Sequence, residues 1–176
     1  MNRPTSLVLG YLLVLVSVSA MAHGPTPRRI TETVDIAAPP QKVWKLVGNF
    51  AGFAAWNPQV SKCVADKGNA VDSQRNVTLT SGAELIDSMD FYDAHNMTYT
   101  YRLMNQDIQK FPVGFYSATI TVKPSAGGSQ VEWIGNFYRA DTQNEPPENL
   151  NDDAAEKAMR DFFHGGLEGL KQAVLR

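Results

Sequence analysis

The chain has 176 residues, a formal net charge of −2 and a single cysteine, Cys63. Its length fits one domain, since domains commonly span about 100–200 residues. A charged fraction of 19% beside 43% hydrophobic residues excludes a disordered, highly charged protein. The slightly acidic balance argues against nucleic-acid binding, which needs a basic field. One cysteine excludes an internal disulfide framework and any metal or iron–sulfur site built from several cysteines.

The first 22 residues have the pattern of a secretory signal peptide. Arg3 precedes the apolar run Leu7–Val18, which is shorter than the roughly 20 residues that span a bilayer. Ala20-Met21-Ala22 then gives the small-residue pattern of a cleavage site. We therefore expect cleavage between Ala22 and His23, a periplasmic location, and no stable membrane anchor afterwards. Residues 23–28 would form a leader, and residues 29–176 a single domain.

The predicted domain begins with a strand followed by two short helices. Arg29–Ile36 alternates between apolar and polar residues, as a half-buried strand does. Pro39-Pro40 ends that strand and suits the first turn of a helix, because proline's fixed φ is helical. Val43, Val47 and Phe50 fall on one face of that helix, and Phe53 and Trp56 indicate a second short helical turn.

Six further segments alternate with period two and are separated by turn residues. We expect strands over Gln59–Ala65, Arg75–Thr80, Ala83–Tyr92, Met97–Met104, Val113–Lys123 and Gln130–Ala140. Short connections between consecutive strands are typical of an antiparallel meander. The inward faces are predicted to carry Met97, Tyr99, Tyr101, Leu103, Ala118, Ile120, Val122, Val131, Trp133 and Phe137.

The last segment is a predicted helix that ends near Leu175. Asn151, Asp152 and Asp153 are good N-cap residues, and Glu156 follows Asp153 at capping-box spacing. Gly165-Gly166 predicts either a bend or a close approach to the sheet. The apolar stripe of this helix comprises Ala155, Met159, Phe162, Phe163, Gly166, Leu167, Leu170 and Val174. These elements predict an α+β domain in which the long helix lies across a curved antiparallel sheet of about seven strands, with a cavity between them.

This arrangement resembles the helix-grip fold of the START-like SRPBCC superfamily, which includes polyketide cyclases, lipid carriers and the birch-pollen allergens. The features that carry the resemblance are the opening strand, the Pro-Pro helix with Val43-Trp44, the Trp56-Asn57-Pro58 turn and the terminal helix. The resemblance implies a domain that binds hydrophobic molecules between sheet and helix, or acts on them there.

A narrower resemblance is to the MxaD type, periplasmic accessory proteins of bacterial methanol oxidation. The segments that carry it are His23–Pro27, Pro112-Val113, Phe137-Tyr138-Arg139, Pro146-Pro147, Leu150-Asn151-Asp152, Ala154-Ala155, Gly166-Leu167 and Leu170-Lys171. This resemblance implies an accessory protein that binds methanol dehydrogenase, its cytochrome c, or both.

The residues themselves give little support for catalysis. No nucleophile–base motif, metal-ligand spacing or phosphate-binding loop is present, so we expect no metal and no cofactor. Glu84 is a weak catalytic candidate. If its strand face lines the cavity, burial would raise the pKa of its carboxyl group; the alternative is an exposed strand face or a structural hydrogen bond to a neighbour. Arg75 and Arg102 are expected to be solvated charges on strand faces. The sequence favours a protein that is not an enzyme.

Two sets of residues are candidates for binding. Aromatic side chains from strands and helix are expected to line a ligand cavity or simply to fill it: Tyr99, Tyr101, Phe115, Tyr116, Trp133, Phe137, Phe162 and Phe163. The segment around Phe137–Asp153 is acidic and stiffened by proline, and it is either a solvated loop or a surface that steers a basic partner. Its expected contacts are Tyr138, Arg139, Asp141, Glu145 and Glu148.

Three functions remain open at this point. The first is a non-enzymatic periplasmic accessory protein of methanol oxidation that uses the acidic segment. The second is a carrier of a small hydrophobic ligand or lipid in the cavity. The third is a polyketide cyclase/dehydrase-like enzyme that uses Glu84. A filled interior would count against the second and third.

Overall fold

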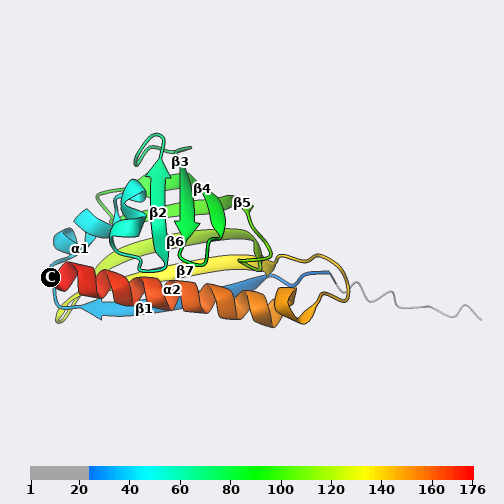
Figure 1. Cartoon of the computed structure of the whole chain (residues 1–176). Helices are drawn as coiled ribbons and strands as arrows, with labels where there is room; N and C mark the ends of the chain where they lie inside the picture. Colours follow the sequence, from blue (N-terminus) through cyan, green and yellow to red (C-terminus); the bar gives the residue numbers. More distant parts are fainter. Residues whose placement is uncertain (1–23) are drawn as a thin grey trace, which may run out of the picture.

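The structure is a computed structural model, and it describes residues 24–176. The predicted signal peptide and its cleavage site lie outside the described residues. The described chain forms a seven-stranded antiparallel sheet with a long C-terminal helix against it, so the predicted fold class is confirmed. Figure 1 shows this helix running along the sheet, close to the first and last strands.

The last six strands form a meander in sequence order, and the first strand pairs with the last one at the edge of the sheet. The strand order of the sheet is β1-β7-β6-β5-β4-β3-β2, and all neighbouring strands are antiparallel. The strands are β1 (Arg28–Ile36), β2 (Val60–Ala65), β3 (Gln74–Leu79), β4 (Glu84–Asp93), β5 (Thr98–Gln106), β6 (Val113–Ser125) and β7 (Gly128–Arg139). Each predicted strand is present, with boundaries that differ by two residues or fewer.

The helical elements lie in two places along the chain. Between β1 and β2 come α1 (Pro40–Val47) and the 3₁₀ helix η1 (Phe50–Ala55), and after β7 come the short 3₁₀ helix η2 (Glu148–Leu150) and α2 (Asp152–Leu175). Asn151 is the N-cap of α2, and its Oδ1 accepts a hydrogen bond of 2.9 Å from the Ala154 amide. The Glu156 carboxylate is instead paired with Arg28 and Arg160.

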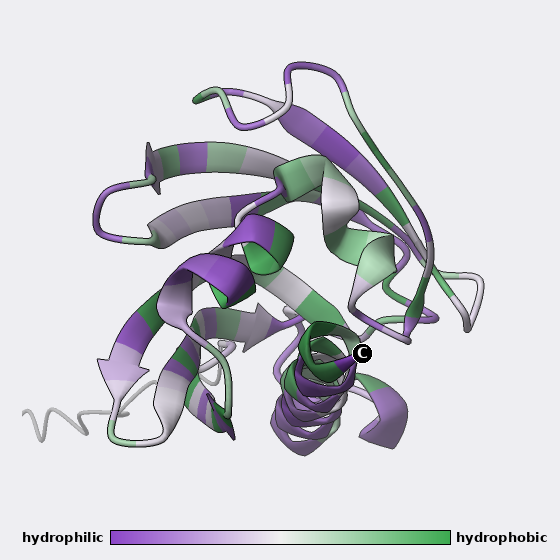
Figure 2. Ribbon diagram, turned by 90° about the vertical axis from the view of Figure 1, so that its left-hand side faces the viewer, coloured by the Kyte–Doolittle hydropathy of each residue, from purple (hydrophilic) through white to green (hydrophobic). Residues whose placement is uncertain are grey.

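The apolar stripe of α2 faces the concave side of the sheet. Figure 2 shows the helix nearly end-on, with the sheet curving around it. All eight residues of the predicted stripe are buried, so this prediction is confirmed. The inward faces predicted for the strands are buried as well, apart from Met97, which is only partly buried and has a positive φ of 51°. Within residues 24–176, no helix is long and apolar enough to cross a membrane.

Glycines let the turn after η1 lie directly on α2. A Cβ on Gly166 would come within 2.8 Å of the Trp133 ring and 2.9 Å of the Asn57 amide nitrogen, and one on Gly169 within 2.2 Å of Pro58. The Gln59 amide nitrogen then donates to the Asp161 and Phe162 carbonyls, at 3.1 and 3.0 Å. The helix is continuous through these positions, which confirms the predicted close approach rather than a bend.

Candidate functional site

The space between the sheet and α2 is occupied by aromatic side chains. Each of the seven rings Tyr99, Tyr101, Tyr116, Trp133, Phe137, Phe162 and Phe163 is at most 3% exposed. Trp133 stacks on Phe163 with ring centroids 4.0 Å apart, and it also packs against Phe162 at 5.8 Å. Tyr101 meets Tyr116 edge-on at 6.0 Å. Of the two alternatives that the sequence left open, the structure shows rings that fill the interior.

Two hollows lie away from this interior. One, of about 440 Å³, is bordered by side chains of β2, β3 and β4, and another, of about 550 Å³, lies where the β6–β7 turn approaches the end of α2. Neither is lined by any of the seven rings. A ligand between sheet and helix would therefore have to displace side chains that now touch one another.

A buried ion pair lies within this aromatic interior. Arg75 on β3 and Asp87 on β4 are directly paired across the two strands, and both are fully buried. The Arg75 Nε donates to Asp87 Oδ2 over 2.9 Å. The guanidinium carbon lies 4.3, 4.1 and 4.5 Å from the ring centres of Phe50, Phe53 and Tyr101. The three ring faces and the Asp87 carboxylate together replace the hydration that the Arg75 guanidinium loses on burial.

Burial and pairing act against each other on the pKa values of this pair. Burial raises the pKa of the Asp87 carboxyl group, and the Arg75 charge and the hydrogen bond from Tyr116 oppose that rise. For Arg75, burial is the largest effect and lowers the pKa of the guanidinium group, but the Asp87 charge together with Tyr99, Tyr101 and Cys63 outweighs it, and the pKa is raised. Arg75 is therefore a permanent buried cation, and Asp87 is the counter-charge that makes its burial possible.

Hydrogen bonds extend this pair into a small polar network. The Tyr116 hydroxyl donates to Asp87 Oδ1 over 2.5 Å, and the Trp133 indole N–H donates to the Tyr101 hydroxyl over 3.2 Å. Arg75 Nη2 also lies 2.9 Å from Asp87 Oδ2 as part of the ion pair. Asn57 Nδ2 and Trp56 Nε1, by contrast, are buried without an acceptor among the described residues.

The face of β4 that carries Glu84 is turned away from the interior. Glu84 is exposed and lines the hollow beside β2 and β3, so it is not the buried acid that a catalytic role required. Arg75, expected to be solvated, is 0% exposed, whereas Arg102 is exposed as expected and pairs with Asp90. The signal that could have identified Arg75 and Asp87 is their opposite charge at positions that a tight turn brings into register.

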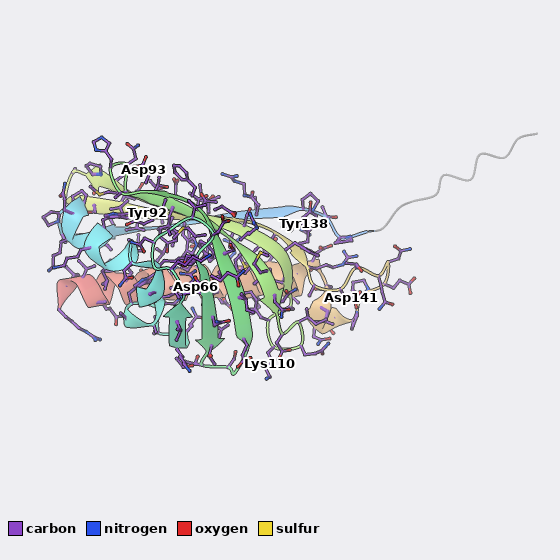
Figure 3. The ribbon with its side chains drawn as sticks, turned by 90° about the horizontal axis from the view of Figure 1, so that it is seen from above. Asp66, Tyr92, Asp93, Lys110, Tyr138 and Asp141 are labelled. Atoms are coloured by element: carbon purple, nitrogen blue, oxygen red, sulfur yellow. The ribbon has the colours of Figure 1, made fainter. Side chains whose placement is uncertain are left out.

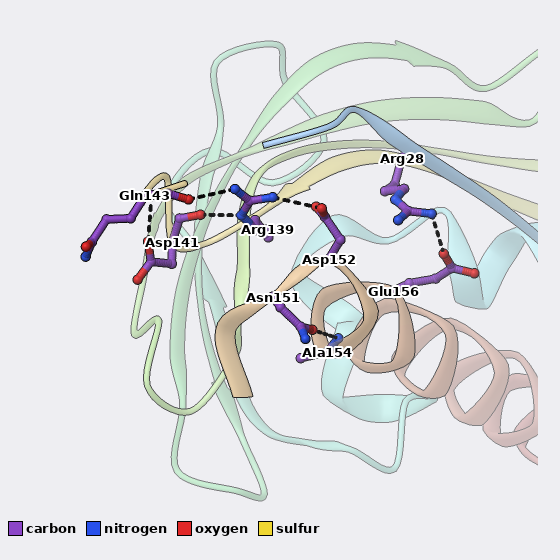
Figure 4. Close-up of polar contacts among 8 residues, drawn as sticks. All are labelled: Arg28, Arg139, Asp141, Gln143, Asn151, Asp152, Ala154 and Glu156. Carbon is purple, nitrogen blue, oxygen red and sulfur yellow. Dashed lines mark hydrogen bonds and ion pairs between the residues drawn. The ribbon is translucent and has the colours of Figure 1, made fainter. Parts of the chain in front are cut away.

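The acidic segment after β7 is held by Arg139. Expected to contact a partner, Arg139 is only 5% exposed, and its guanidinium lies 2.8 Å from Asp152 and from the carbonyls of Asp141 and Gln143 (Figure 4). It therefore fixes the segment onto the N-terminus of α2. Glu145 and Glu148 are exposed and Asp141 is partly exposed, which leaves their carboxylates accessible from solvent.

Aromatic side chains are exposed beside this segment. Tyr138 is 37% exposed, and Figure 3 shows it at the same end of the molecule as Asp141. Phe115, which the sequence placed among the cavity residues, is 77% exposed. The reason is a bulge in β6, where the register with β7 shifts between Gly114 and Ser117. The bulge turns the ring away from the interior.

Comparison with known proteins defines the family. Residues 27–175 match the family described as polyketide cyclase / dehydrase and lipid transport. The match spans nearly all of the described chain, and the chain belongs to this family.

Individual relatives agree with this assignment. The structure of the protein XoxI from Bacillus cereus is 27% identical, with a TM-score of 0.70 over 84% of this chain and 95% of that one. MLP-like protein 423 of Arabidopsis thaliana is 27% identical over 127 residues, which cover 68% of this chain and 81% of that protein. The crystal structure of Ara h 8.0201 is 17% identical, has a TM-score of 0.66 over 85% of this chain and 99% of that one, and shares the fold.

Proposed function

We propose that this protein is a non-enzymatic accessory protein that acts by binding a protein partner at its surface, the partner being methanol dehydrogenase, its cytochrome c, or both. The proposal places the protein in the periplasm, after removal of residues 1–22. Its site is the acidic segment 141–153 together with the exposed Tyr138.

The observation that carries the proposal is the filled interior. Members of a family described by cyclase, dehydrase and lipid-transport activity need space for a small molecule. Here Trp133, Phe162 and Phe163 occupy that space, and the buried acid Asp87 is already engaged by Arg75 and Tyr116. Glu84, the weak catalytic candidate, lies outside the interior. The surface is what remains for function.

Two further findings support the choice of partner. The resemblance to MxaD-type proteins extends through the segments around Phe137–Arg139 and Leu150–Asp152. In addition, the similar structure from Bacillus cereus is of a protein named XoxI. Acidic side chains at the edge of a surface favour association with a basic protein, chiefly by raising its association rate.

Titration of the purified protein against the dehydrogenase and the cytochrome separately tests this proposal. We expect saturable binding to at least one of them, and a change in the rate of electron transfer between the two when the protein is added. Neutralising Asp141, Glu145 and Glu148 together should slow association at low salt. The effect should fade near 0.15 M salt, where the Debye length is about 8 Å.

A second candidate is the transport of a small hydrophobic ligand that carries an acceptor group. The observation in its favour is the pair of buried donors without acceptors among the described residues, Asn57 Nδ2 and Trp56 Nε1. Buried donors normally have partners, so a ligand that supplied an acceptor would stabilise this region. Such a ligand requires the aromatic core to open. Stoichiometric binding of a fluorescent fatty acid, with no binding to dehydrogenase or cytochrome, would favour this candidate over the first.

A further inference from the structure

We infer that Phe115, Tyr138 and Met104 form the apolar centre of a docking surface for a protein whose own apolar patch is bordered by lysine or arginine. We call this surface the bulge patch. The inference rests on the proposed function, since it gives the contact that an accessory protein of this kind would use.

Phe115 lies in the β6 bulge with its backbone in the left-handed region. Its φ is +47°, a region that L-residues other than glycine, asparagine and aspartate rarely adopt. A phenylalanine in this backbone conformation lowers the stability of the fold, and because its ring is 77% exposed, packing offsets little of that loss. Strained residues of this kind cluster at binding sites, and bulges commonly re-aim a side chain there.

The bulge brings three exposed apolar side chains to one end of the sheet. Gly114 is paired with Tyr138 on β7, which places Phe115 next to that tyrosine. On the other side, Arg102 of β5 is paired with Ser117, and Met104 continues β5 towards the same end. Met104 is 50% exposed and Tyr138 is 37% exposed. Aromatic and methionine side chains are the types enriched in the cores of protein interfaces.

The charges around the bulge patch select the partner. The acidic segment begins at Asp141, three residues after Tyr138, and it continues with the exposed Glu145 and Glu148. Arg139 keeps this segment in place from beneath, through contacts of 2.8 Å (Figure 4). Of the cations on this face, Arg102 is neutralised by Asp90 and Arg29 donates to Asn136. An apolar centre bordered by carboxylates complements a basic-rimmed partner.

Phe115→Asn separates a binding role from a structural one, because asparagine tolerates a positive φ. We expect this variant to keep or raise the melting temperature and to weaken partner binding at least tenfold, at low and at high salt. Phe91→Asn is the matched control. Phe91 is 49% exposed but lies near the far end of β4, opposite Thr100, and its replacement should leave binding unchanged. Tyr138→Ala supplies a second, independent variant at the bulge patch.

The outcomes distinguish this inference from the function it rests on. If the unaltered protein binds dehydrogenase or cytochrome while Phe115→Asn and Tyr138→Ala bind equally well, the bulge patch is wrong and the proposed function stands. If the unaltered protein binds neither, both fall. Dimerisation of the unaltered protein in sedimentation, abolished by Phe115→Asn, would also overturn the inference, because the patch would then join two copies of this chain.

Discussion

Replacing Asp87 with asparagine removes one charge from the interior and changes little else in shape. Arg75 would then remain a fully buried cation with no counter-charge. Removing one partner of a buried ion pair typically costs about 3–5 kcal/mol. The ring faces of Phe50, Phe53 and Tyr101 would recover only part of this, since each cation–π contact contributes about 0.5–2 kcal/mol. We therefore expect Asp87→Asn to be destabilised by roughly 3 kcal/mol or more.

Thermal and urea unfolding measure this difference directly. For a domain of this size a loss of 3–5 kcal/mol lowers the melting temperature by roughly 6–20 °C. The matched control is Asp90→Asn, which breaks the exposed pair of Asp90 with Arg102 and should cost less than about 1 kcal/mol. Replacing both charges, as in Arg75→Met with Asp87→Leu, should be less damaging than Asp87→Leu alone. An Asp87→Asn variant as stable as the control would refute the reasoning.

Three further results are expected. Phe162→Ala should lose about 3–5 kcal/mol of unfolding free energy, because its ring is only 3% exposed against the sheet; an unchanged urea midpoint would mean that the stripe faces solvent. Gly166→Ala should be destabilising by about 1–3 kcal/mol although alanine favours helices, because its Cβ would lie 2.8 Å from Trp133; a stabilised variant would contradict this packing. Burial raises the pKa of Tyr99 to about 12, so the stability that this neutral phenol contributes is complete below pH ~10 and lost as pH rises toward 12; phenolate absorbance rising without unfolding would count against its burial.

The helical periodicity of its apolar residues allowed α2 to be predicted from the sequence. Its eight apolar positions recur at spacings of three and four, and only one face of a helix can satisfy them. The strands could be predicted for a similar reason: apolar and polar residues alternate along each one, and turn residues mark where it ends. The close approach at Gly165-Gly166 was foreseen as one of two options, but the turn that fills the space, Trp56–Gln59, is far away in sequence.

Alternation does not say which face of a strand is inward, so it left open whether Glu84 faces the interior or solvent. On β4 the register shifts between Ile86 and Asp87 and again between Met89 and Phe91, so a simple count from Glu84 misleads. Pairing of Asp87 with Arg75 depends on the register between two strands, which no single segment contains. The bulge that exposes Phe115 likewise needs its partner strand, β7, to be recognised.

The central claim is that the protein works through its surface on a protein partner while its interior stays filled. Native mass spectrometry of the protein purified from its own cells, alone and then mixed with methanol dehydrogenase and cytochrome c, tests both parts in one measurement. The account predicts the mass of the bare polypeptide when alone and a complex with at least one of the two proteins when mixed. A stoichiometric small molecule retained on the protein, with no complex formed, would contradict it.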